Sequence, residues 1–151
     1  MNHARYVTCI IFCVIFIRCS PAEHSLVGEW SGSHPQGGAN VFLFRANGEA
    51  EWRFDNPQMS QTNLKYTIDY STTPHHVRIS GFDHGPLQGV VMYGILEFPC
   101  PNRFRLDLEP GLPDVDPEEI RPKVFGDDTQ EYRRKMSASE RTTYHKEGGM
   151  Q

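Results

Sequence analysis

The sequence predicts one small all-β domain, an antiparallel up-and-down meander of about eight strands that closes into a small barrel. Apolar and polar residues alternate with a period of two along most of the chain, which gives a strand one buried and one solvated face. Turn-forming residues separate these segments at short intervals, without a helix-length connection between them. Consecutive strands joined in this way pair with each other and close most readily into a small barrel.

Residues 1–22 are predicted to be a signal peptide. Residues 6–17 are uncharged, but this run is shorter than the roughly 20 apolar residues that a membrane-spanning helix needs. Ser20-Pro21-Ala22 supplies a small-x-small cleavage site, so the mature chain is expected to begin at Glu23 and to be exported, periplasmic or secreted. Two alternatives stay open: a buried N-terminal strand or helix, and a lipid anchor through Cys19, which Arg18 disfavours.

The mature chain is acidic and has one cysteine. Of the four cysteines only Cys100 lies beyond residue 22, so no internal disulfide is expected and the core alone must hold the fold. Losing Arg5 and Arg18 leaves 13 Lys and Arg against 19 Asp and Glu, a net charge of −6. The chain has no basic stripe, which disfavours nucleic-acid binding.

The expected strands follow one another along residues 23–136, which form the predicted domain. They cover residues 26–31, 41–44, 50–54, 64–70, 76–80, 90–96, 103–109 and 129–135. Residues 41–44 and 90–96 are apolar at every position but Gly94, so these strands are expected to be covered on both faces. Gly94 is expected to mark a bulge or bend.

Turn residues and two polar segments connect or follow these strands. Asn47-Gly48 predicts a type I′ hairpin, and residues 71–74, 83–86 and 99–102 are further expected turns. Residues 109–119, rich in proline and acid, predict a surface loop. Residues 137–151 are polar and predict a disordered tail.

The chain is similar to a known superfamily in an ordered set of short motifs. Gly28-Glu29-Trp30 resembles the Gly-x-Trp motif of the lipocalins, members of the calycin superfamily. Residues 26–134 resemble a bacterial family of secreted lipocalin-like domains without assigned function. The motifs that carry this resemblance are Tyr66-Thr67-Ile68-Asp69, Thr73-Pro74, Val77-Arg78-Ile79, Gly94-Ile95-Leu96-Glu97 and Arg121-Pro122-Lys123-Val124-Phe125.

The resemblance implies a lipocalin-like barrel with Gly28, Trp30, Arg121 and Pro122 as structural residues. It also implies that an arginine packs on Trp30 at the closed end of the barrel, a role open to Arg133, Arg134 or Arg121. The sequence departs from the family at Leu96, at the longer turn 99–102 and at the long acidic loop 109–119. Leu96 and the turn 99–102 lie at an expected hairpin end, as does the start of the loop 109–119.

The sequence predicts neither an enzyme nor a metal or cofactor site. It has no nucleophile elbow, zinc-protease pair, phosphate-binding glycine loop or Cys-x-x-Cys motif. His75 and His76 are adjacent in an extended segment, so their rings should point to opposite faces. Asp114, Asp116 and Glu118 lack the glycine and the distal glutamate of an EF-hand loop. Asp69 and Asp107 are expected on the solvated face.

The functional hypotheses rest on large side chains that are expected on the inner faces of the strands. An eight-stranded barrel is either just filled by side chains or just able to hold a small ligand. The first hypothesis is an exported binding protein that holds a small apolar or amphipathic ligand. The second is a filled barrel that contacts a protein or envelope partner, most readily through residues 109–119. The predicted ligand-lining residues are Trp52, Phe54, Tyr66, Tyr70, Met92 and Phe104.

Overall fold

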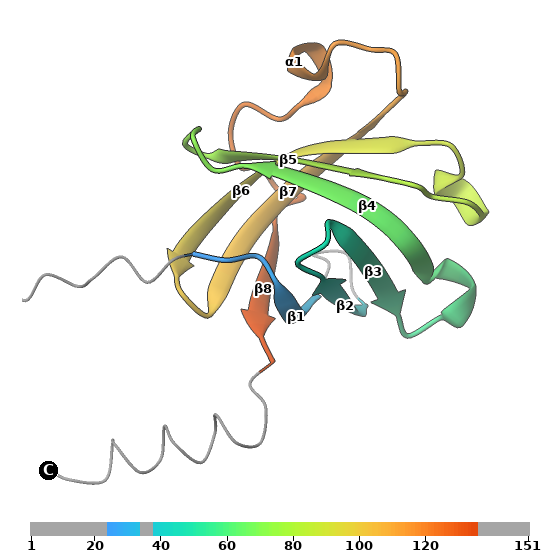
Figure 1. The fold of residues 1–151 in the computed structure, drawn as a ribbon, viewed down its shortest axis with the longest axis horizontal. Helices are drawn as coiled ribbons and strands as arrows, with labels where there is room; N and C mark the ends of the chain where they lie inside the picture. Colours follow the sequence, from blue (N-terminus) through green and yellow to red (C-terminus); the bar gives the residue numbers. More distant parts are fainter. Residues whose placement is uncertain (1–23, 34–37, 136–151) are drawn as a thin grey trace, which may run out of the picture.

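The computed structural model describes residues 24–33 and 38–135. Within them, eight antiparallel strands form a closed barrel in sequence order (Figure 1), which confirms the predicted fold class. The strands are β1 (Gly28–Ser33), β2 (Ala39–Phe44), β3 (Glu49–Phe54), β4 (Gln61–Asp69), β5 (His75–Ser80), β6 (Val91–Cys100), β7 (Arg103–Gly111) and β8 (Gln130–Arg134). The connections carry two 3₁₀ turns, η1 (Pro57–Met59) and η2 (Gly85–Leu87), and one short helix, α1 (Pro117–Ile120). The predicted signal peptide and tail lie outside the described residues.

Pairing of the first strand with the last closes the barrel. Trp30 of β1 lies opposite Arg134 of β8, and Gly32 lies opposite Tyr132. A Cβ atom on Gly32 would come within 2.6 Å of the Tyr132 ring. This glycine therefore makes room for a large inward-facing side chain at the seam.

The inner faces of the strands form one hydrophobic core. Alternate residues of each strand point inward because successive side chains of a strand leave on opposite faces. The largest of them are aromatic: Trp30, Phe42, Phe44, Phe104 and Tyr132 are at most 1% exposed. Burial of such side chains is worth roughly 1.5–3 kcal/mol each, so the fold needs no disulfide. Cys100 is a free, half-buried thiol.

The β2–β3 hairpin has a different turn from the one predicted. Gly48 N–H donates to the Arg45 carbonyl, and Arg45 N–H donates to the Glu49 carbonyl. Gly48 has a φ of +81°, whereas Asn47 does not have a positive φ. A type I′ turn needs positive φ at both central residues, so the type I′ prediction is wrong. The hairpin is a type I turn followed by a glycine in the left-handed region, which adds one residue to the loop.

Gly94 marks a close approach between strands. Of the two features predicted there, the bulge is wrong and the bend stays a prediction. Pairing of β6 with β7 is regular around Gly94 and shifts only between Glu97 and Cys100. A Cβ atom on Gly94 would lie 2.3 Å from the Asp107 carbonyl oxygen and 2.5 Å from the Leu108 side chain. Glycine is needed here because the facing strand leaves no space for a side chain.

Residues 112–129, here called the strap, cross the outside of the barrel and carry α1 (Figure 1). Beneath the strap, the outward-facing Val91, Tyr93 and Ile95 of β6 are at most 3% exposed. The Tyr93 hydroxyl donates to the Leu112 carbonyl at 3.1 Å. The expectation that β6 is covered on both faces is therefore confirmed. For β2 it is wrong, because its outward-facing Val41 and Leu43 are only half-buried.

Two sequence expectations about polar segments also change. Asp107 was expected in solvent, but the strap leaves it only 5% exposed, and its carboxylate accepts hydrogen bonds from Gly126 N and the Thr129 hydroxyl. Asp69 is exposed as predicted. The expected loop 109–119 is in fact the end of β7, a turn and most of α1.

One end of the barrel is closed by residues that precede β1. Leu26 is completely buried, and its carbonyl accepts a hydrogen bond from the Trp30 indole at 2.7 Å. Of the three candidate arginines, Arg134 lies over the Trp30 ring, 4.2 Å from its centroid. Arg134 also donates to the carbonyls of Val27 and Ser25. Arg121 lies on the strap instead.

Candidate functional site

The barrel interior is the first candidate site, and its predicted lining residues pack against one another. The Trp52 ring stacks on Phe42 with centroids 4.6 Å apart, and Phe54 contacts Trp52 at 4.8 Å. Phe104 stacks on Tyr132 at 4.8 Å. Met92 is buried in the same core. The apolar surfaces of these side chains are therefore buried against other side chains of the core.

The two predicted tyrosines differ in position. Tyr66 packs edge-on against Phe44, and its hydroxyl donates to the Arg45 carbonyl at 2.9 Å. Burial raises the pKa of the Tyr66 hydroxyl. Tyr70 lies beyond the end of β4 and is 47% exposed, so its assignment to the interior is wrong. Its hydroxyl accepts a hydrogen bond from Leu26 N at the closed end.

A layer of buried polar side chains lies inside the barrel, at the end opposite Trp30. Asn40 donates from its amide to Gln130 Oε1 and accepts from the Trp52 indole, both at 3.3 Å. The Tyr132 hydroxyl donates to the same Gln130 oxygen at 2.7 Å. Burial raises the pKa of Tyr132 far above its ordinary value, which keeps this hydroxyl protonated as a donor.

Sequence reasoning did not single out these amides, although one signal was present. Asn40 shares the period-two face of Phe42 and Phe44, which places it inside the barrel. Alternation does not place Gln61 inside the barrel, because the β3–β4 register shifts between Ala50 and Trp52. Gln61 is 1% exposed, and its Oε1 has no hydrogen-bond partner among the described residues.

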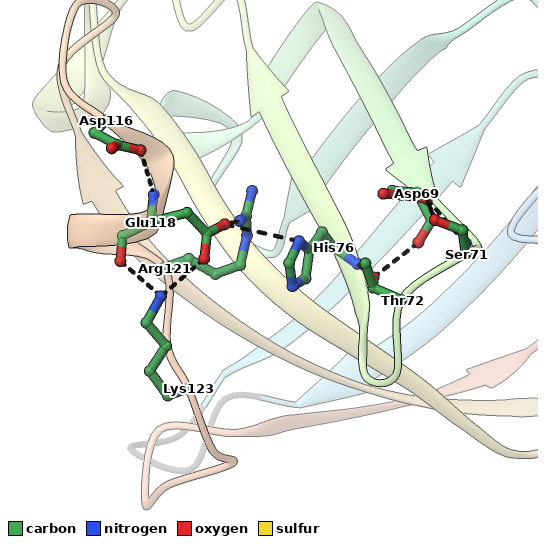
Figure 2. A network of polar contacts seen from close by, with 8 residues as sticks. All are labelled: Asp69, Ser71, Thr72, His76, Asp116, Glu118, Arg121 and Lys123. Carbon is green, nitrogen blue, oxygen red and sulfur yellow. Dashed lines mark hydrogen bonds and ion pairs between the residues drawn. The ribbon is translucent and has the colours of Figure 1, made fainter.

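The second candidate site is a groove on the outside of the barrel, between strands β4 and β5 and the strap. Its volume is about 360 Å³. Both walls carry charged side chains. Among the lining residues, Figure 2 shows Asp69, His76, Asp116, Glu118 and Arg121. The barrel contributes Thr67, Asp69, His76 and Arg78, and the strap contributes Asp116, Pro117, Glu118 and Arg121. We call these eight residues, with the intervening Ile68 and Val77, the groove.

Glu118 is the centre of the contacts on the strap side of the groove. Its carboxylate pairs with Arg121 and lies 3.1 Å from Lys123 Nζ. It also lies 3.9 Å from His76 Nδ1 on the barrel side (Figure 2). The Lys123 hydrogen bond and the nearby positive charges hold the pKa of Glu118 below its ordinary value. Glu118 therefore loses its proton more readily than a free glutamate, and its carboxylate faces His76 of β5.

Local sequence explains why Glu118 is held there. Asp116 accepts a hydrogen bond from Glu118 N at 2.9 Å and so caps the N-terminus of α1, with Pro117 at the first helical position, where proline is favoured. Arg121 N–H donates to the Pro117 carbonyl and ends the helix. This capped turn fixes the direction in which the Glu118 side chain leaves the strap.

The barrel side of the groove is held by the β4–β5 turn. Asp69 accepts hydrogen bonds from the Ser71 hydroxyl at 2.6 Å and the Ser71 amide at 2.8 Å, and these bonds lower the pKa of Asp69. The Thr72 hydroxyl donates to the Asp69 carbonyl and accepts from His76 N. His75 turns away toward Tyr70 and Phe98, so the two histidines face opposite sides as predicted.

Two further depressions lie outside the barrel. One of about 500 Å³ at the closed end is lined by His24, Ser25, Tyr70 and His75. Another of about 350 Å³ lies against β1 and β8. None of the three depressions is lined by Trp52, Phe54, Tyr66, Met92 or Phe104.

Residues 24–33 and 38–135 contain no group of three or more His, Cys, Asp or Glu side chains arranged to hold a metal ion. In the same part of the chain, no helix is long and apolar enough to cross a membrane. Comparison of the sequence and the structure with protein-family models, curated proteins and solved structures gives no match.

Proposed function

We propose that this protein is a filled β-barrel that acts as an interaction module through its outer surface. One observation carries the proposal: five of the six predicted ligand-lining residues belong to the hydrophobic core or pack against it. An eight-stranded barrel can be filled by side chains or can hold one small ligand, and the mutual packing of these side chains favours the filled form. The hydroxyl of Tyr66, one of the predicted lining residues, donates to a backbone carbonyl of the protein itself.

The groove is the part of the surface that best suits a partner. It brings acidic and basic side chains together over about 360 Å³, and it includes Asp116, Pro117 and Glu118 of the acidic segment 109–119 that the sequence proposed as a contact. Ion pairs that are exposed, such as Glu118 with Lys123, contribute about 0–1 kcal/mol to stability. Exchanging such pairs for a partner's charges therefore costs the barrel little. The partner is expected to present a polar surface with charges of both signs.

A small-molecule carrier is the second candidate, and one observation favours it. The Gln61 carboxamide oxygen is buried without a hydrogen-bond partner among the described residues. A buried acceptor without a partner costs about 1–3 kcal/mol, and the polar group of an amphipathic ligand would remove that cost. The resemblance to lipocalin-like domains points the same way.

Native mass spectrometry of the protein purified from its own host separates the two candidates. We expect the mass of the polypeptide alone, together with failure to bind a hydrophobic dye. A reproducible mass excess that is lost on denaturation would establish a carrier and overturn the filled-barrel proposal.

Photo-crosslinking in the same host tests the groove itself. A photoreactive residue at Thr67, inside the groove, should give a defined adduct, and the same residue at the exposed Thr62 of β4 should not. Glu118→Lys should abolish the adduct because it reverses the central charge of the groove. An adduct of the same mass from position 62, or one insensitive to Glu118→Lys, would contradict the groove as the contact.

A further inference from the structure

Two connections meet at the end of the barrel opposite Trp30, here called the mouth. They are residues 55–60, between β3 and β4, and residues 81–90, between β5 and β6. The second connection, here called the mouth loop, covers the core from outside. Its Phe82 is 4% exposed and lies edge-on to Trp52 with centroids 6.5 Å apart, and its Leu87 and Val90 pack against the core.

His84 ties the mouth loop to the neighbouring connection. Its Nε2 atom contacts the Ser60 carbonyl oxygen at 2.9 Å, and its Nδ1 atom contacts the Asp83 carboxylate. Its own carbonyl accepts a hydrogen bond from the buried Gln61 amide at 3.1 Å. A half-exposed ring is thus joined to the barrel interior through one backbone group.

The number of N–H groups on the ring decides how many of these contacts can be hydrogen bonds at once. A carbonyl oxygen and a carboxylate accept hydrogen bonds but do not donate them, and a neutral imidazole has only one N–H group. Either neutral tautomer of His84 would leave a nitrogen lone pair facing Ser60 O or Asp83. Only the imidazolium donates to both acceptors at once. The groups in contact with the ring are the Asp83 carboxylate from its own loop and the uncharged Ser60 carbonyl from the other.

We propose that His84 is a proton-dependent clasp that holds the mouth loop over the core. The closed loop uses two N–H groups of the ring, so it binds a proton that an open loop does not require. Closure is therefore strongest in acid and weakens as the pH rises through the range in which histidine changes charge, between about pH 5 and about pH 8. Opening would expose Phe82 and the polar layer beneath it. This property is independent of the partner proposed above.

Hydrogen exchange of the full chain measures opening of the loop through the hydrogen bonds that opening breaks. The Gly89 amide bonds to the Phe82 carbonyl at 3.0 Å, and the Val90 amide bonds to the Leu87 carbonyl at 2.9 Å. Both bonds lie within the mouth loop, so they report openings that unfold the loop as Phe82 leaves the core. After correction for the intrinsic effect of pH, their protection should fall by up to about fivefold between about pH 5.5 and about pH 8, the loss expected for one solvent-exposed charged contact. The Tyr66 amide bonds to Gly48 at the other end of the barrel, and its protection should not change with pH in this way.

Three variants identify the responsible group. His84→Gln should remove the pH dependence at Gly89, and His76→Gln, which changes the groove histidine, should leave it intact. Asp83→Ala should also remove the pH dependence, but the loop should stay protected at high pH. In this variant a neutral ring needs to donate only one hydrogen bond, to the Ser60 carbonyl. Protection that does not change with pH in the unmodified protein overturns the proposal. So does a pH dependence that survives in His84→Gln.

Discussion

At the scale of single residues, Arg134 connects three parts of the closed end. Its guanidinium covers the Trp30 ring and donates to two carbonyls in the segment that precedes β1. A Cβ on Gly28 would come within 2.7 Å of the same guanidinium. Gly28, Trp30 and Arg134 therefore pack as one unit. The Gly-x-Trp spacing is explained because both the glycine and the tryptophan contact the same guanidinium.

Replacing Arg134 by methionine keeps most of the aliphatic stem and removes the charge and the donors. We expect the free energy of unfolding to fall by about 2–3 kcal/mol, since a cation–π contact is worth roughly 0.5–2 kcal/mol and each lost hydrogen bond about 1 kcal/mol. Urea denaturation followed by circular dichroism measures this. Arg133→Met, at the exposed neighbour on β8, should change stability by less than about 0.5 kcal/mol. Equal losses in both variants would show that Arg134 holds no special position.

Period-two alternation placed most interior residues correctly and failed at two informative positions. Trp52 and Phe104 are buried as predicted. Tyr70 continues the same alternation, but β4 ends at Asp69, and a sequence period does not say where a strand leaves the barrel. Asp107 does face outward, as predicted, but alternation cannot reveal that a later segment folds over that face. Both failures come from long-range packing that local pattern does not encode.

At the scale of elements, β6 and β7 pair closely because Gly94 has no side chain. Gly94→Ala would place a methyl group 2.3 Å from a backbone carbonyl, which cannot move without breaking the sheet. Overpacking of this kind costs about 1–3 kcal/mol, and we expect the upper end of that range in thermal or urea unfolding. Gly126→Ala is the matched control, because its Cβ would meet only the Asp107 carboxylate at an ordinary 3.8 Å. Similar stability of both variants would contradict the close approach.

The sequence predicted the eight strands and their order, but not the groove. Strands could be found because each buries one face, which alternation records directly. The groove could not, because it joins the outer face of β4 and β5 to residues far later in the chain: Arg78 and Asp116 are 38 positions apart. Asp116-Pro117 followed by Glu118-Glu119 is a helix-start signal that could have revealed α1. The same segment was instead assigned to a loop because of its proline and acid content.

At the scale of the whole molecule, ion pairs surround a core that excludes charge. Four carboxylates on the outside have pKa values below their ordinary range, each chiefly through a side-chain hydrogen bond to Lys135, Lys65, Ser71 or Lys123. They are Glu29, Glu49, Asp69 and Glu118. They are mostly solvent-exposed, so each contributes little. Because all four shifts have the same sign, their effects on stability add.

Stability is therefore expected to fall in acid. A carboxylate with a lowered pKa binds protons less readily in the folded than in the unfolded chain, so its contribution is present above the ordinary value, 4.5 for Glu118, and is lost as the pH falls through the folded value. Thermal unfolding between about pH 5 and about pH 3 should show a falling midpoint, and salt near 1 M should flatten the slope by screening exposed pairs. Glu118→Gln should flatten it more than Glu119→Gln, its exposed neighbour on α1. A midpoint that holds steady or rises toward pH 3 would mean that the carboxylate contacts do not stabilise the barrel.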